Sequence, residues 1–437
     1  MPVTTRERAL AASSGCPSAP GLAFDFGPPA NETSLGIVAL AAALLFKNGQ
    51  TTERMAVTVE RLGQRLGLPV RVLPDWDKLT IEIDGTSLSQ TVPTKPLGVD
   101  MNRVLAVSKV IDRLCDGSLR LEEARPALLS AGNLPPVSTL RFTSFAATGA
   151  ASLGVIFGAL DMTSLILIAA SAALGALVRR CWLSGLGTNP FTQPLCAALI
   201  AGSVAVISST SLHLSSSALV AFCPCMVLVP GPHLLNGAID LVRTRIALGI
   251  ARLAYAGVVL LMICVGLLLG FTAGGGVPPA AGSSAPVPFL ADVIAAGCAV
   301  ASFGTLFSMP WRTLPFPIVA GMVGHAARWA LISLAGTNVA TGALAACILI
   351  SIIVTPVVDR LHLPFAALGF SAVVSMIPGF FLFTAASAVV ALISAGPQAP
   401  ITLLTDIAVN GVTAILVILA MTFGLILPRM LLERRHS

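Results

Sequence analysis

Residues 214–242 read LSSSALVAFCPCMVLVPGPHLLNGAIDLV. The stretch is longer than the roughly 20 apolar residues that a helix needs to cross a bilayer, and Pro230 and Gly231 interrupt it. Proline removes a backbone donor and clashes with the preceding helical turn, while glycine adds backbone freedom. The stretch therefore predicts a membrane helix that is broken near its centre.

The composition around this segment is that of a membrane protein with a polar N-terminal part. The 437 residues are 55% hydrophobic and 11% charged, whereas soluble domains carry about 25% charged residues. Of the 46 charged residues, 29 lie in the first 141 positions. An ordinary soluble enzyme is excluded, and the net charge of +6 is assigned to membrane topology rather than to nucleic-acid binding.

Ten apolar segments follow the polar part, and together they predict an all-α polytopic membrane protein. Their approximate bounds are 142–160, 163–178, 193–211, 214–242, 253–271, 289–308, 316–334, 339–357, 364–392 and 401–427.

The basic residues between these segments orient the chain. With the N-terminal part in the cytoplasm, every basic loop residue falls on the cytoplasmic side, as the positive-inside rule requires. These residues are Arg179, Arg180, Arg243, Arg245, Arg312, Arg360, Arg429, Arg434 and Arg435. The pattern predicts a multi-pass protein of the cytoplasmic membrane with both termini in the cytoplasm and the lipid bilayer as its surroundings.

The N-terminal part predicts a disordered tail, residues 1–30, and a cytoplasmic α+β domain, residues 31–140. Helices are expected at 35–46, 51–66, 102–115 and 121–129, and strands at 70–73, 79–83 and 86–92, with Asp84 and Gly85 forming a hairpin turn. The rest divides into a first membrane repeat (141–272), an external linker (273–288), a second repeat (289–428) and a basic cytoplasmic tail (429–437).

The membrane part is similar to itself. Nine identities recur 149 residues apart, namely Gly175, Arg179, Ser184, Gly187, Thr188, Asn189, Leu212, His213 and Leu214 with Gly324, Arg328, Ser333, Gly336, Thr337, Asn338, Leu361, His362 and Leu363. Coincidence is the alternative, but Arg, Asn and His are rare in apolar segments. Five spans per half make the second copy enter the membrane from the opposite side, which predicts the inverted repeat of secondary transporters.

The repeat also pairs two breaks. Pro230 and Gly231 recur as Pro378 and Gly379, in two segments of equal length. Broken helices expose backbone groups and dipole ends that can hold the charged ends of a polar substrate. The alternative is a pair of proline kinks that serve packing alone.

Few residues in the apolar part can carry chemistry. No hydrolytic triad, phosphate loop or metal site is recognised, so neither an enzyme nor a cofactor is expected. His233, Asn236 and Asp240 lie on one face of the helix after the first break, and Thr384 is the second-half equivalent of Asn236. Asp240 and His233 are candidate proton carriers. Alternatively, Asp240 pairs with Arg243 or Arg245 at the membrane boundary.

Four other charged or titratable residues lie in the apolar part. His325 and Arg328 lie one turn apart and serve either function or structure. Asp292 is expected at an outer interface, and Arg252 as a cytoplasmic anchor. The candidate substrate-binding or proton-pathway residues are Pro230, Gly231, His233, Asn236, Asp240, His325, Arg328, Pro378, Gly379 and Thr384.

Several short motifs resemble the threonine/serine exporter family. They are residues 48–54 (NGQTTER), 59–62 (VERL) and 66–67 (LG) in the N-terminal part, 229–231 (VPG) and 236–241 (NGAIDL) in the first repeat, and 324–329 (GHAARW) and 377–379 (IPG) in the second. The resemblance extends over about residues 35–427. The resemblance implies export of threonine and serine driven by the proton-motive force, and the family also includes exporters of other small polar metabolites such as dicarboxylates.

Three hypotheses follow. The first is a proton-coupled antiporter of small hydroxylated amino acids, with its site between the two broken spans. The second is an enzymatic or sensory N-terminal domain whose ligand the membrane part delivers. The third is a passive channel. The substrate, coupling stoichiometry and a homo-oligomeric state are left open by the sequence.

Overall fold

The computed structural model describes residues 34–183, 189–275, 287–360 and 365–433. The predicted tail 1–30 lies outside these residues, as do most of the predicted linker and the end of the C-terminal tail. The same holds for the repeat identities at Ser184, Gly187, Thr188 and residues 361–363.

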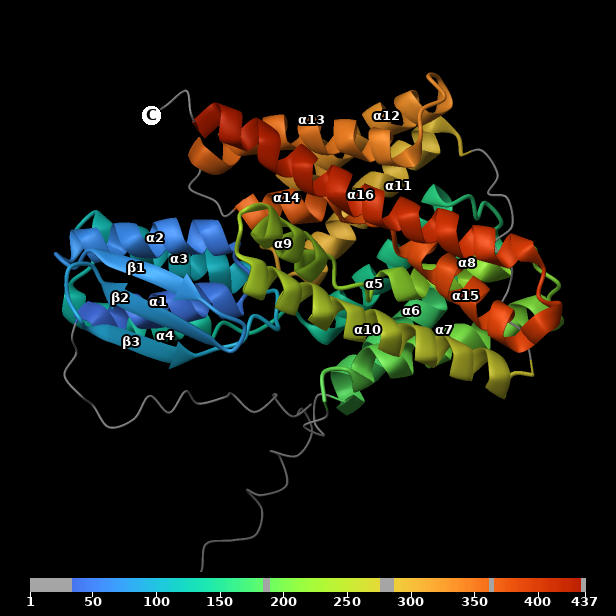
Figure 1. Cartoon of the computed structure of the whole chain (residues 1–437), viewed down its shortest axis with the longest axis horizontal. Helices are drawn as coiled ribbons and strands as arrows, with labels where there is room; N and C mark the ends of the chain where they lie inside the picture. Colours follow the sequence, from blue (N-terminus) through green and yellow to red (C-terminus); the bar gives the residue numbers. More distant parts are fainter. Residues whose placement is uncertain (1–33, 184–188, 276–286, 361–364, 434–437) are drawn as a thin grey trace, which may run out of the picture.

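The first 100 described residues form a body that we call the N-terminal unit, which lies beside the remaining helices (Figure 1). Its three strands form an antiparallel sheet in the order β1-β2-β3, and the predicted hairpin turn at Asp84 and Gly85 connects β2 and β3. The elements are α1 (Ser34–Lys47), α2 (Thr52–Arg65), β1 (Val70–Pro74), β2 (Lys78–Ile83), β3 (Ser89–Pro93), α3 (Met101–Cys115) and α4 (Leu121–Gly132).

Helix α1 is the core of this unit. Residues 37–46 are all buried, because α2, α3, α4 and the sheet surround the helix. A helix that is apolar on every side is stable in water only when it is enclosed in this way. The apolar alternation of β2, with Leu79, Ile81 and Ile83 buried, turns one face of the sheet toward α1.

The rest of the described chain is helical. The first group comprises α5 (Thr139–Ile156), α6 (Met162–Leu177), η1 (Val178–Leu183), α7 (Thr192–Thr210), α8 (Ser217–Met226), α9 (Gly231–Val242) and α10 (Ile246–Ala273). The second comprises α11 (Phe289–Leu306), α12 (Pro315–Ser333), α13 (Val339–Arg360), α14 (Phe365–Val373), η2 (Val374–Met376), α15 (Gly379–Ala395), η3 (Gly396–Gln398) and α16 (Ile401–Glu433).

Among the described residues, seven helices are long and apolar enough to cross a membrane, or eight if the bent pair α8–α9 is one span. The chain is thus a polytopic membrane protein. The predicted spans 142–160 and 316–334 coincide with α5 and α12, which do not meet this criterion of length and apolarity, and of 364–392 only the part in α15 does. The number of ten spans stays a prediction.

Corresponding helices in the two groups have corresponding neighbours. In the first group α5 packs against α6 and α8, while α10 packs against α7 and α9. In the second group α11 packs against α12 and α14, and α16 packs against α13 and α15. Helices α5 and α11 also pack against each other, so they join the two groups.

The N-terminal unit and the helices share their apolar cores. Leu248, in the first turn of α10, is buried in the core of the N-terminal unit. Met101 and Leu105 of α3 are buried in the core of the helices instead. The amide of Met101 also donates a hydrogen bond to the carbonyl of Phe307, with the two atoms 2.8 Å apart. The two bodies therefore interlock.

Both Pro-Gly sequences break a helix. Helices α8 and α9 meet at 63° across Pro230, and α15 begins directly after Pro378. At each break the glycine amide donates to the carbonyl two residues before it, Val229 or Ile377, over 2.8 Å. Each proline thus sits at the centre of the same tight turn.

The two breaks contact each other. A methyl group added to Gly231 would collide with Cδ1 of Ile377. A Cβ atom added to Gly379 would lie 3.0 Å from Cγ of Met226 and 3.4 Å from Cγ2 of Val229. Val229 and Ile377 each precede their own Pro-Gly, so each break places its apolar residue against the glycine of the other. The close approach of the two breaks, in addition to backbone freedom, explains why glycine occupies both positions.

The contact between the two breaks can be tested by measuring the free energy of unfolding. Gly231→Ala is expected to lower the free energy of unfolding by about 1–3 kcal/mol, because Ile377 is buried and cannot move away freely. The double substitution Gly231→Ala with Ile377→Ala should lose less than the sum of the two single changes. Thermal unfolding in detergent measures both effects.

The control is Gly257→Ala on α10, where an added methyl group meets open space. This change should be neutral or slightly stabilising, since alanine is the better helix former. Additive losses in the double variant would show that the two breaks do not touch.

Candidate functional site

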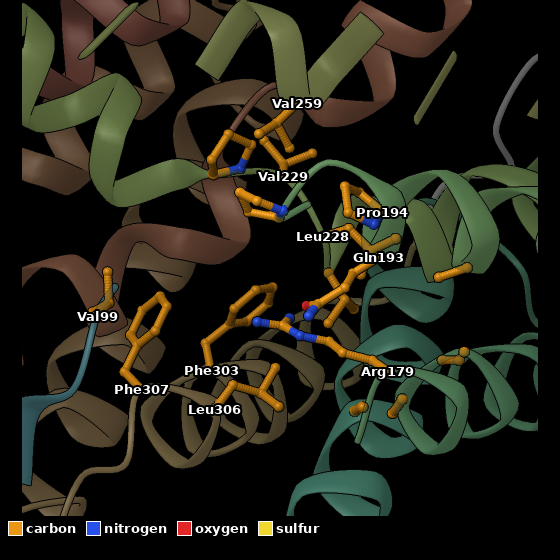
Figure 2. A pocket seen from close by; sticks show the side chains of 18 of the residues that line it. Val99, Arg179, Gln193, Pro194, Leu228, Val229, Val259, Phe303, Leu306 and Phe307 are labelled. Carbon is orange, nitrogen blue, oxygen red and sulfur yellow. The ribbon is translucent and has the colours of Figure 1, made fainter. Parts of the chain in front are cut away.

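A cavity of about 230 Å³ lies beside the first break (Figure 2). The break supplies part of its wall with Val227, Leu228, Val229 and Pro230, and Phe303 of α11 closes another side. Its polar lining comes from four helices of the first group and η1, and consists of Ser171, Arg179, Gln193, His233 and Tyr255. Among the described residues that line it, none belongs to α14 or α15, so this cavity lies at the first break alone, whereas the sequence predicts a substrate site between the two broken spans.

Arg179 is the dominant charge in the cavity. Figure 2 shows its side chain crossing the cavity toward Phe303, with Gln193 pointing toward the guanidinium group. Its guanidinium carbon lies 5.6 Å from the ring of Phe142, and no carboxylate among the described residues forms an ion pair with it. A guanidinium presents paired donors that match a carboxylate. The cavity is therefore suited to a small solute that carries a carboxylate.

The backbone at the break is less available than the sequence suggested. The amides of Gly231 and His233 already donate to the carbonyls of Val229 and Pro230, and Pro232 has no amide hydrogen. The first turn of α9 therefore has few free donors for an anion. Arg179 and Gln193 supply the donors of this cavity in its place.

Ser171 and Asn236 add unsatisfied polar atoms near the break. The hydroxyl of Ser171 lines the cavity, is buried and has no hydrogen-bond partner in the described part of the chain. The buried Asn236 lies one turn beyond His233 on α9, and its Oδ1 atom also has no partner there. Such atoms are uncommon in folded proteins because an unmade buried hydrogen bond costs about 1–3 kcal/mol. A bound polar solute would satisfy Ser171.

A second cavity of about 570 Å³, which we call the vestibule, adjoins the first. Both are lined by Leu97, Val99, Phe142, Arg179 and Leu306. The vestibule lies between the N-terminal unit and the helices, since the residues after β3 form one of its walls. The cavity at the break is therefore approached from the side of the N-terminal unit.

The vestibule has an excess of basic residues. Its charged lining consists of Lys47, Lys95, Arg103, Arg179 and Arg180 against Asp77 and Asp100. Arg103 and Asp100 form an ion pair of 3.5 Å. Burial raises the pKa of Asp100, and burial together with the charge of Arg103 lowers the pKa of Lys47. Even so, the positive excess favours the entry of anionic groups.

His233 connects the cavity with the N-terminal unit. Its ring centre lies 4.8 Å from that of Tyr255 and 6.5 Å from that of Trp76, which follows β1. His233 and Pro230 are thus the predicted site residues that reach the cavity, whereas Asn236 and Asp240 lie further along α9.

Asp240 is held in an ion-pair network. Its carboxylate lies 3.4 Å from Nε of Arg252 and 3.6 Å from Nη1 of Arg245, and it accepts a hydrogen bond of 3.1 Å from the hydroxyl of Thr52. Of the two interpretations, pairing at the boundary matches these contacts. Arg252, which was expected as a cytoplasmic anchor, is only 2% exposed and contacts Asp240.

The network extends into the N-terminal unit. Glu53 forms an ion pair with Arg243 and lies 3.8 Å from Arg245. Thr52 and Glu53 belong to the N-terminal motif NGQTTER, and Asp240 to the motif NGAIDL. The two motifs that are far apart in the sequence therefore meet in one set of contacts.

His325 lies in a second buried cluster. Its Nδ1 atom is 3.2 Å from Oδ2 of Asp292, and its Nε2 atom is 2.8 Å from Oγ of Ser375. Asp292 was expected at an interface, but it is 3% exposed. The order Asp-His-Ser is that of a hydrolytic triad, yet all three side chains are buried, so no substrate reaches the hydroxyl in this conformation.

The remaining predicted residues lie near the second break. Pro378 and Gly379 form it, and the hydroxyl of Thr384 donates to the carbonyl of Phe380 on its own helix over 2.9 Å. Arg328 is half-buried and lies one turn beyond His325 on α12. The ten candidates thus do not form one site: two line the cavity, Asp240 belongs to its own network, and the others lie at the two breaks, along α9 or on α12 and α15.

Sequence reasoning missed the most exposed charge of the cavity. The positive-inside pattern places Arg179 in a cytoplasmic loop, although the repeat pairs it with Arg328, one of the candidate site residues. Ser171, Gln193 and Tyr255 were not singled out, and no motif marks them. The correspondence of Arg179 with Arg328 in the repeat was the signal in the sequence that could have identified Arg179 as a site residue.

The Asp240 network should contribute to stability. Arg252→Met is expected to lower the free energy of unfolding by about 3–5 kcal/mol, because it leaves Asp240 buried with one partner fewer. The double substitution Asp240→Leu with Arg252→Met should recover part of the loss. Thermal unfolding in detergent compares both with Arg71→Gln, which removes an exposed ion pair with Asp84 and should cost at most about 1 kcal/mol. An equal loss for Arg71→Gln and Arg252→Met would contradict the structural role.

Comparison with known families agrees with this arrangement. A family described as putative threonine/serine exporter matches residues 36–273, and one described as threonine/serine exporter, ThrE, matches residues 292–431. No curated protein and no solved structure matches. The first match spans α1 to α10 and the second spans α11 to α16, which confirms the resemblance carried by the short motifs. The matches point to a transporter rather than an enzyme, and the chain belongs to the threonine/serine exporter family.

Proposed function

We propose that this protein exports threonine and serine across the cytoplasmic membrane in exchange for protons. The observation that carries the proposal is the cavity at the first break, in which Arg179 has no carboxylate partner among the described residues. In this proposal the N-terminal unit is a cytoplasmic α+β domain, both termini are cytoplasmic, and the helices form ten spans.

The chemistry of the cavity suits a small amino acid. Arg179 and Gln193 bind the carboxylate, and the hydroxyl of Ser171 and the ring hydroxyl of Tyr255 lie in the same lining for the polar side chain. An ammonium group finds carbonyls at the break, where helices are interrupted. The volume of about 230 Å³ is below the roughly 300–1,000 Å³ of sites for drug-sized ligands.

An inverted repeat supports a carrier mechanism. The equivalent neighbours of the two helix groups and the mutual contact of the two breaks are what two five-helix copies related by pseudo-symmetry would produce. In such carriers the substrate lies at broken helices, and the two repeats rock around it. A carrier of this kind saturates with substrate, whereas a passive channel does not.

The vestibule provides the path by which an exporter would load its substrate. With the N-terminal unit in the cytoplasm, the cavity is open toward the compartment from which substrate is loaded. Leu97, Gly98 and Val99 belong to the N-terminal unit and line both cavities. We therefore assign this unit to the substrate path and not to a separate enzymatic activity.

Export of a dicarboxylate is the second candidate. Two observations favour it, namely the basic excess of the vestibule and the lack of an acidic residue among the cavity-lining residues that the structure describes. A dicarboxylate needs no acidic partner, while an ammonium group is usually paired with one or with several carbonyls. The substrate panel below separates the two candidates.

Arg179→Gln tests the site. Loss of a charged hydrogen-bonding partner costs about 1.5–3 kcal/mol, so the KM for threonine efflux should rise by roughly ten-fold or more. The measurement is efflux of labelled threonine, serine and a dicarboxylate from proteoliposomes with an imposed pH gradient. Arg312→Gln is the matched control, since Arg312 is exposed and does not line the cavity. It should leave the KM unchanged.

The outcomes separate the candidates. Saturable threonine efflux that Arg179→Gln weakens supports the amino-acid exporter. Efflux of the dicarboxylate without that of threonine favours the second candidate. An unchanged KM in Arg179→Gln would show that the cavity is not the substrate site, and non-saturable flux without a gradient would indicate a channel.

A further inference from the structure

We propose that Asp292, His325 and Ser375 form the proton-binding site that couples substrate export to the proton gradient. The inference rests on the proposed exporter function and names residues that lie outside the cavity. The three side chains come from α11, α12 and η2, and each is at most 3% exposed. They lie at the second break, whereas the substrate cavity lies at the first.

The contacts of His325 suit a group that binds and releases a proton. A carboxylate lies 3.2 Å from one ring nitrogen and a hydroxyl lies 2.8 Å from the other. In neutral His325 the N–H group at Nδ1 donates a hydrogen bond to the carboxylate of Asp292, while Nε2 accepts a hydrogen bond from the hydroxyl of Ser375. Histidine is the side chain that changes charge most readily near physiological pH.

The charges around His325 are few. Asp292 faces it from α11, and Arg328 lies one turn away on its own helix. From α13, Ala346 and Ile350 approach the same turn of α12, and from α14 Ala372 does so, all without charge. Asp292 and Arg328 balance each other when His325 is neutral. A proton on His325 adds an uncompensated charge, which a buried site disfavours.

The conformation and the protonation state are therefore linked. With the substrate cavity open toward the N-terminal unit, His325 is buried and favours its neutral form. Proton uptake requires a conformation in which this cluster is exposed to water. The sequence places Asp292 near the outer end of its span, so protons enter from outside. This order is that of an antiporter, which loads substrate after it has released its proton inside.

Protonation acts on the second break through one hydrogen bond. When Nε2 of His325 gains a proton it becomes a donor, so Ser375 must change from donor to acceptor. Ser375 lies in η2, two residues before Ile377, and Ile377 packs against Gly231 of the first break. The change at His325 is thus transmitted through contacting residues to the wall of the substrate cavity.

The repeat explains why the two sites differ. His325 corresponds to Ala176 and Ser375 to Val227, by the offsets of 149 and 148 residues that relate the two halves. Both Ala176 and Val227 line the substrate cavity. Small apolar residues leave space at the first break, and a hydrogen-bonded cluster fills the equivalent space at the second. One half therefore takes the substrate and the other takes the proton.

The earlier candidates have other roles in this scheme. Asp240 is neutralised by Arg245 and Arg252 and lies at the boundary with the N-terminal unit. His233 contacts the rings of Tyr255 and Trp76 in the wall of the substrate cavity, and none of the salt bridges of the described residues joins it to a carboxylate. The pair of His325 and Asp292 combines burial with a titratable partner.

The test compares exchange with uphill transport for His325→Gln in proteoliposomes. Exchange of labelled for unlabelled threonine at equal concentrations requires no net proton movement, so it should remain within about three-fold of wild type. Transport driven by an imposed pH gradient should fall by at least ten-fold, and threonine should no longer move protons, as followed with a pH-sensitive dye inside the vesicles. The control is His213→Asn, which removes an exposed histidine and should change neither activity.

A second variant secures the result. Ser375→Ala removes a single hydroxyl group and should also reduce gradient-driven transport more than exchange, and it is used if His325→Gln does not fold. Gradient-driven transport at the wild-type rate in His325→Gln would overturn the proposal, as would an equal loss of exchange and uphill transport in both variants. Absence of threonine and serine transport by the wild-type protein would refute the exporter function itself.

Discussion

The contact between the two Pro-Gly breaks is the constraint on which the helical part of the molecule depends. Each break presents an apolar residue to the glycine of the other, so neither glycine tolerates a side chain without movement of its neighbour. Close contact fixes where α8, α9, α14 and α15 can lie, and the surrounding helices follow. Pro230 of the first break lines the cavity, and Ser375, which contacts His325, lies two residues before Ile377 of the second break, so both sites are connected to this contact.

The two buried carboxylates of the described helices lie close to basic or imidazole groups. Asp240 and Asp292 are each within 4 Å of a basic or imidazole side chain, as the cost of an isolated ion in an apolar interior requires. Arg179 differs from these carboxylates, because its side chain is exposed toward the cavity and forms no ion pair with a carboxylate of the described residues. The guanidinium group is therefore accessible to a solute that carries a carboxylate.

Local signals in the sequence predicted the local structure. The Asp84-Gly85 turn, the apolar runs and the Pro-Gly pairs each act within a few residues, and the helices, hairpin and breaks lie where they indicate. Contacts between distant residues were not predictable in this way. Thr52 and Asp240 are 188 residues apart, and His325 is 33 and 50 residues from its partners.

The direction of the Arg179 side chain could not be predicted from the sequence either. A basic residue after a membrane segment satisfies the positive-inside rule whether its side chain faces the cytoplasm or bends back into a cavity. The rule therefore gave the side of the membrane and could not give the direction of the side chain. The cavity is formed by residues that are distant in the sequence, among them Phe142, Phe303 and the first break, so it becomes visible only in the folded structure.

The interlocked cores make the N-terminal unit mechanically part of the helical body. Leu248 holds the first turn of α10 in the core of the unit, so a displacement of this end of α10 would require the unit to move with it or to repack. Met101 and Leu105 hold α3 to the helices in return. A chimera that combined this unit with the helices of another family member would have to exchange both sets of residues together. Variation at either set would consequently be tied to variation at the other.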